Sequence, residues 1–206
     1  MSLPLVLKHA LERVVLLPVR MRHRRSAKAK QRVRLDALAT VRRTLGQADQ
    51  LNAIGLRTVF NVGLYLLLLD DDLAQFTDDL VCAIGDRRRA FVAKHEAILL
   101  YEAGEDLPQL LGHDFRQAVT DLGASPEQFQ RLNAASSDLN EFWREERQFL
   151  GEIRNALSAH REHDALAYVT ALEQLKPLDV MRRAADLSGR MERLVNVLAD
   201  IALLGH

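Results

Sequence analysis

The sequence predicts an all-α protein, a multi-helix bundle that forms a single domain over residues 1–206. Leu, Ala, Arg and Glu are abundant, and all four favour helices. Gly and Pro are scarce, with 10 and 5 copies. Apolar residues recur at intervals of three and four, whereas almost no segment alternates between apolar and polar residues as a strand does.

The first half of the chain is expected to hold four helices. The first covers residues 4–17 and ends at Pro18. The second covers residues 19–53, and its second half carries an apolar stripe formed by Leu35, Leu38, Val41 and Leu45. Residues 56–69 predict a short apolar helix. The three acids at 70–72 suit the start of the next helix, which extends towards residue 102 with a break at Gly85.

The second half begins with a region at 104–123 that is expected to be loosely ordered around one short helix, residues 113–122. Ser125, Pro126 and Gln128 then predict a helix start, with a capping box between the first and the last of them. This long helix covers residues 126–162. Its apolar face is formed by Phe142, Phe149, Ile153 and Leu157.

A C-terminal helical hairpin is expected after the long helix. Its first helix covers residues 164–176 and its second covers residues 178–204. The apolar positions of the second are Met181, Ala185, Met191, Leu194, Val195 and Leu198.

The charge is unevenly distributed, although the net charge of the chain is zero. Residues 1–50 hold 12 of the 28 Lys and Arg and carry +9, so the rest carries −9. One interpretation is that the basic segment, residues 1–55, packs on the acidic remainder and neutralises it. The densest basic run consists of Arg20, Arg22, Arg24, Arg25, Lys28, Lys30, Arg32 and Arg34.

This run has three interpretations: a solvated helix face, a surface for the RNA or DNA backbone, and a surface that docks on anionic membranes. No aromatic residue lies within it, so base stacking is not expected there.

Several classes of site and location are not expected. Cys82 is the only cysteine, which excludes an intrachain disulfide and suits a reducing compartment. The longest apolar run, residues 59–69, is too short to span a membrane, so we expect a cytoplasmic protein. Neither a glycine-rich phosphate loop nor a zinc-protease motif is present, and no cofactor is expected.

The segment E-I-R-N-A-L-S-A-H, residues 152–160, resembles the signature of the HEPN superfamily, helical proteins that include metal-independent endoribonuclease toxins. Arg154 is followed directly by the polar Asn155. Five residues separate Arg154 from His160. The segment ends a long helix and precedes a short helix and a longer one, so the resemblance covers about residues 125–206. It implies a toxin or defence function with RNA as substrate and an antitoxin or other protein as partner.

The chemistry of such a site is coherent. A histidine such as His160 exchanges protons near neutral pH. It could take the proton from the 2′-hydroxyl of RNA or give a proton to the leaving oxygen. Arg154 would stabilise charge on the phosphate, and Asn155 would position the phosphate or ribose. Six residues along an ideal helix place Arg154 and His160 about 120° apart. The resemblance implies a symmetric homodimer, in which two motifs face one cleft.

Other interpretations of the segment remain open. His160 continues the apolar stripe and suits a core position, and the stem of Arg154 suits a cover over apolar surface. His160, His163 and Asp164 also suggest a metal site, but Asp164 fits better as a helix cap, and we expect no metal. The competing function is a non-catalytic helical module that binds RNA or a partner protein.

Overall fold

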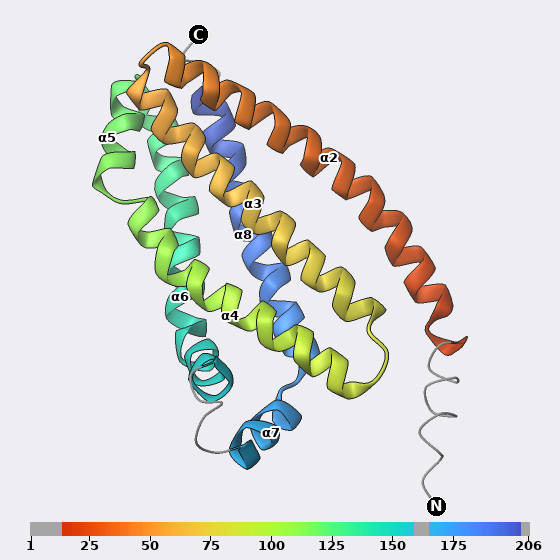
Figure 1. Ribbon diagram of the computed structural model, residues 1–206. Helices are drawn as coiled ribbons and strands as arrows, with labels where there is room; N and C mark the ends of the chain where they lie inside the picture. The colour runs from red at the N-terminus through yellow and green to blue at the C-terminus, as the bar shows by residue number, and fades with distance from the viewer. Residues whose placement is uncertain (1–13, 159–164, 203–206) are drawn as a thin grey trace, which may run out of the picture.

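The computed structural model describes residues 14–158 and 165–202. Within these ranges the chain forms seven helices and no strand, which confirms the predicted all-α bundle (Figure 1). The predicted helix at 4–17 falls almost entirely outside the described residues. The helices are α2 (Leu17–Gln50), α3 (Ile54–Cys82), α4 (Asp86–Leu110), α5 (His113–Asp121), α6 (Pro126–Ser158), α7 (Ala165–Gln174) and α8 (Pro177–Ala202).

The hydrophobic core lies among α3, α4, α6 and α8, which pack against one another. Each of these helices contributes apolar side chains at helical spacing, and their largest members are almost completely buried. Among them are Leu66, Leu100, Phe142, Leu150 and Leu194, all at most 1% exposed. α5 packs on α3, and α7 packs on α4 and α6.

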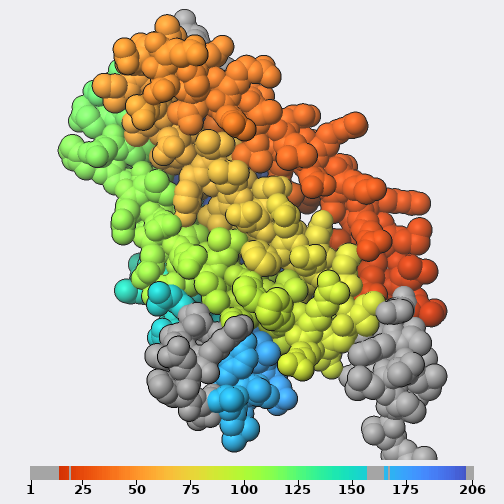
Figure 2. Space-filling view, viewed as in Figure 1, coloured from red at the N-terminus to blue at the C-terminus, as the bar shows by residue number. Residues whose placement is uncertain are grey.

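α2 lies outside this core, along α3, at one edge of the bundle (Figure 1). In the space-filling view its side chains project from that edge (Figure 2). Only Arg20 and Ala48 are buried among its described side chains. α2 is therefore a peripheral helix with one covered side.

The start of α6 confirms the predicted capping box. The backbone N–H of Gln128 donates to the Ser125 hydroxyl (3.2 Å), and the backbone N–H of Ser125 donates to the Gln128 side chain (2.8 Å). Phe142 and Ile153 of the predicted stripe are buried, and Phe149 is partly buried. Leu157 and the predicted end of this helix at 162 fall where no side chain is described.

The predicted boundary at residues 70–72 is wrong, because α3 runs without a break from Ile54 to Cys82. Two of these three acids accept hydrogen bonds from side chains instead of capping a new helix. Arg34 of α2 donates to Asp70 (2.8 Å), and Gln75 donates to Asp71 (2.9 Å). The break at Gly85 is confirmed, where φ is 86°.

The region at 104–123 is also more regular than predicted. α4 continues through it to Leu110, and α5 occupies most of the remainder.

Candidate functional site

The motif at residues 154–160 lies at the end of α6, and the structure describes its first two residues. The side chains of Arg154 and Asn155 are exposed. His160 lies outside the described residues, as do His163 and Asp164. The guanidinium of Arg154 lies 5.0 Å from the centre of the Tyr101 ring on α4. The charged end of Arg154 is therefore placed for a cation–π contact with Tyr101.

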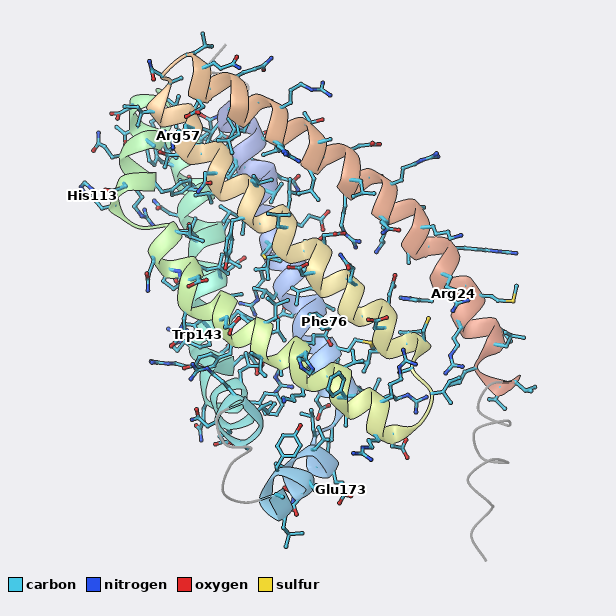
Figure 3. All side chains as sticks on the ribbon, in the orientation of Figure 1. Arg24, Arg57, Phe76, His113, Trp143 and Glu173 are labelled. Carbon is cyan, nitrogen blue, oxygen red and sulfur yellow. The ribbon has the colours of Figure 1, made fainter. Side chains whose placement is uncertain are left out.

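Two glycines bring aromatic rings into the contact between α4 and α6. A Cβ atom at Gly104 of α4 would lie 2.2 Å from the ring of Trp143, which comes from α6 (Figure 3). In return, a Cβ atom at Gly151 of α6 would lie 3.4 Å from the ring of Tyr101. The two ring centres are 5.1 Å apart, at 76°, which is the favourable edge-to-face arrangement.

These rings continue into a row that includes two arginines. Arg147 lies over Trp143 at 5.6 Å from the ring centre, and Arg154 lies over Tyr101. Both rings are partly exposed. We call Arg147, Trp143, Tyr101 and Arg154 the aromatic row. Neither ring was singled out from the sequence. Gly151, inside the predicted helix at 126–162, was a signal of close packing, whereas Gly104 lies in the region that was expected to be loosely ordered.

The predicted basic run divides into residues that bond to α3 and residues that are exposed. Arg20 is 8% exposed, and it donates to the carbonyls of Val81 (3.1 Å) and Ala83 (3.0 Å) at the end of α3. Helix carbonyls at that end lack helical partners and attract cations. His23 contacts Asp78 of α3 at 2.5 Å. The contact between His23 and Asp78 and the pair between Arg34 and Asp70 agree with the interpretation that the basic segment packs on acidic residues.

The other six residues of the run are exposed: Arg22, Arg24, Arg25, Lys28, Lys30 and Arg32. At 100° per residue, four of them lie on the half of α2 that faces away from Arg20 and Arg34, with Lys28 at the edge of that half, whereas Arg24 and Lys30 lie nearer the side that faces α3. We call these four the basic face: Arg22, Arg25, Lys28 and Arg32. They extend over about 15 Å of helix. No Asp or Glu lies between residues 13 and 35, and the nearest acid of α2 is Asp36, which follows Arg32 by about one turn on the same side of the helix.

A buried carboxyl group lies on α4 away from both surfaces. Glu96 is fully buried, and Thr77 of α3 donates to its Oε1 at 3.3 Å. Its Oε2 has no hydrogen bond from any described residue. Burial raises the pKa of Glu96 to about 7, and the bond from Thr77 opposes this only partly. The group is therefore a site of pH-dependent stability.

A cavity of about 980 Å³ lies between α7, α8 and the nearby ends of α2, α3 and α4. Its walls are chiefly apolar and include Tyr168, Leu172 and Met181. Arg87 and Glu173 are among the charged residues of both signs that line it. Because these charges oppose each other, the lining favours neither an anion nor a cation.

Within residues 14–158 and 165–202, no three His, Cys, Asp or Glu side chains are grouped so that they could hold a metal ion. No helix formed by the described residues is long and apolar enough to cross a membrane. Comparison of the chain with models of protein families, with characterised proteins and with solved structures found no match. The resemblance to the HEPN superfamily therefore stays a prediction.

Proposed function

We propose that the protein binds single-stranded RNA through the basic face of α2. The observation that carries this proposal is a group of six exposed basic residues between positions 22 and 32 without an acid among them. Arg20 and Arg34 hold the inner side of the same helix on α3, so the outer side is presented on a fixed support. Fixed cations that follow a line suit the phosphates of a nucleic-acid backbone.

The test is the salt dependence of RNA binding. Neutralising four phosphates on a single strand gives a slope of log K against log salt of about −3. Arg25→Ala combined with Lys28→Ala should make this slope shallower by about 1.4. The matched control is Arg42→Ala with Arg43→Ala, which removes two exposed charges from the same helix outside the basic face.

The control should leave the slope close to that of the parent. An equal change in both double variants would mean that net charge, and not the basic face, governs binding. Failure of the parent to bind RNA even at low salt would contradict the proposal. It would then favour the competing function, a module that binds a partner protein.

A second candidate function is metal-independent RNA cleavage by Arg154, Asn155 and His160 in a symmetric dimer. The exposure of both Arg154 and Asn155 at the end of α6 supports it, since both must reach a phosphate in solution. α6 lies at the opposite edge of the bundle from α2 (Figure 1). Cleavage and basic-face binding would therefore take place on separate surfaces of one protomer.

Cleavage is tested with end-labelled single-stranded RNA in EDTA. The parent should leave cyclic phosphate ends, while Arg154→Ala and His160→Ala should lose activity with unchanged helicity and dimer size. Arg144→Ala, at another exposed arginine of α6, is the matched control and should stay active. Equal activity of the parent and of both motif variants would exclude this second function.

A further inference from the structure

We propose that the aromatic row is a stacking platform for an unpaired nucleobase of single-stranded RNA. This inference rests on the proposed RNA-binding function and adds a second contact surface to it. The ligand class follows from the chemistry of the row, which presents two partly exposed rings, each with one guanidinium group beside it. Unpaired bases stack on aromatic side chains and on arginine planes.

The row has a regular geometry on α6. Trp143, Arg147, Gly151 and Arg154 follow one another at intervals of four, four and three, so they share one face of the helix. Tyr101 enters this face from α4 at the position that Gly151 leaves open. Arg147 and Arg154 are about 10 Å apart along the axis. Trp143 precedes Arg147 by one turn, so the positions along α6 alternate between ring and guanidinium.

The rings are held in place before any ligand arrives. Trp143 packs directly on the backbone at Gly104, and Tyr101 packs against Gly151. The hydroxyl of Tyr101 also donates to Glu105 at 3.0 Å. A platform that is already ordered loses little conformational freedom when a base stacks on it.

The charges around the row separate its role from that of the basic face. Glu105 of α4 accepts the hydrogen bond from Tyr101 and therefore places a carboxylate beside the row. The surface is therefore mixed in charge, and stacking must supply most of its affinity. We expect binding at the row to depend weakly on salt, in contrast to binding at the basic face.

Trp143 is the only tryptophan of the chain, so its fluorescence reports directly on the platform. The folded full-length protein is titrated with a four-nucleotide single-stranded RNA and with an abasic ribose-phosphate strand of equal length. The expected result is saturable quenching of Trp143 by the RNA and none by the abasic strand. The quenching should persist in the double variant Arg25→Ala, Lys28→Ala, since that variant leaves the row intact.

A second measurement follows a labelled RNA in place of the protein. Trp143→Leu should weaken binding of the short RNA on the order of tenfold, and Trp143→Phe, which keeps a ring, should weaken it less. Arg144→Ala is the control on the same helix and should bind as the parent does. Circular dichroism and Tm verify that each variant is folded.

The outcomes distinguish this inference from the function on which it rests. RNA binding that responds to the basic-face variants, without quenching of Trp143, would overturn the platform and leave the proposed function standing. Quenching by the abasic strand equal to that by RNA would also overturn it, because the signal would then report phosphate contact. Absence of all RNA binding would overturn both.

Discussion

α2 and α6 are nearly equal in length, at 34 and 33 residues, yet they depend on different interactions. α6 has eight buried residues among its described side chains, whereas α2 has two. α6 is held by apolar packing on α4 and α8, while the first half of α2 is held on α3 by Arg20, His23 and Arg34. A helix attached by polar contacts along one narrow side can carry charge over the remainder.

The largest expected difference between the two helices concerns apolar truncation. Phe142→Ala on α6 should lower the free energy of unfolding by about 3 to 5 kcal/mol, because the ring is 1% exposed and would leave a cavity. Leu35→Ala on α2 should change it by less than about 0.5 kcal/mol, because Leu35 is 53% exposed. Urea denaturation measures both. Similar losses in the two variants would mean that α2 belongs to the core.

The next effect concerns Glu96 of α4, which is buried in the core that α6 shares and α2 does not. Its pKa is raised to about 7, so the folded protein favours the protonated group. This stabilisation is complete below the unfolded pKa of about 4.5 and is lost as the pH rises towards about 7. The loss in the free energy of unfolding amounts to about 3 kcal/mol. Unfolding free energies of the parent should fall across that range.

Glu96→Gln should remove that pH dependence and should be more stable than the parent above about pH 7. Glu192→Gln, at an exposed position of α8, is the control and should keep the parent's profile. Parallel profiles for the parent and Glu96→Gln would mean that folding does not raise the pKa of Glu96.

A smaller effect separates the two sides of α2 itself. Arg20→Ala should cost about 1.5 to 3 kcal/mol, because the α3 carbonyls lose charged donors. Arg25→Ala should leave stability within about 0.5 kcal/mol and should weaken RNA binding. Denaturation and RNA titration on both variants give the two readouts. Loss of stability in Arg25→Ala would mean that the outer side of α2 is not a free surface.

The smallest expected effect is a gain. Gly46 lies inside α2, and a Cβ atom there would meet no heavy atom within 4 Å. Gly46→Ala should therefore stabilise the protein by about 0.5 to 1 kcal/mol, visible as a higher Tm. Gly123→Ala is the matched control: it is equally open, but its φ of +77° makes the same change unfavourable. A lower Tm for Gly46→Ala would place an unrecognised contact on α2.

Local signals in the sequence predicted much of the fold. The capping box at Ser125 and Gln128 involves residues three apart, so the chain alone specifies it. Periodicity placed Met191, Leu194 and Leu198 correctly in the core. It misplaced Ala185, since the neighbouring Ala184 is buried instead, and Leu35, which is exposed. The spacing of apolar residues identifies the buried face of a helix, but it does not show which residues at the border of that face are buried.

Contacts between residues that are far apart in the sequence could not be predicted in the same way. The acids at 70–72 indicate a helix start when they are considered alone, but Asp70 has its partner, Arg34, 36 positions earlier. Arg20 belonged by composition to the predicted nucleic-acid surface, and only the packing of α2 on α3 shows that it is buried. Tyr101 and Trp143 become neighbours only when α4 packs on α6.

The reciprocal placement of ring and glycine between α4 and α6 has a consequence for how these helices can slide. Each helix contributes one glycine and one aromatic ring: Trp143 of α6 packs against Gly104 of α4, and Tyr101 of α4 packs against Gly151 of α6. A shift of either helix by one turn would push both rings against side chains at the same time. The two contacts together therefore favour a single packing register of α4 on α6. This register also sets the position of Arg154 along α6 relative to Tyr101 of α4.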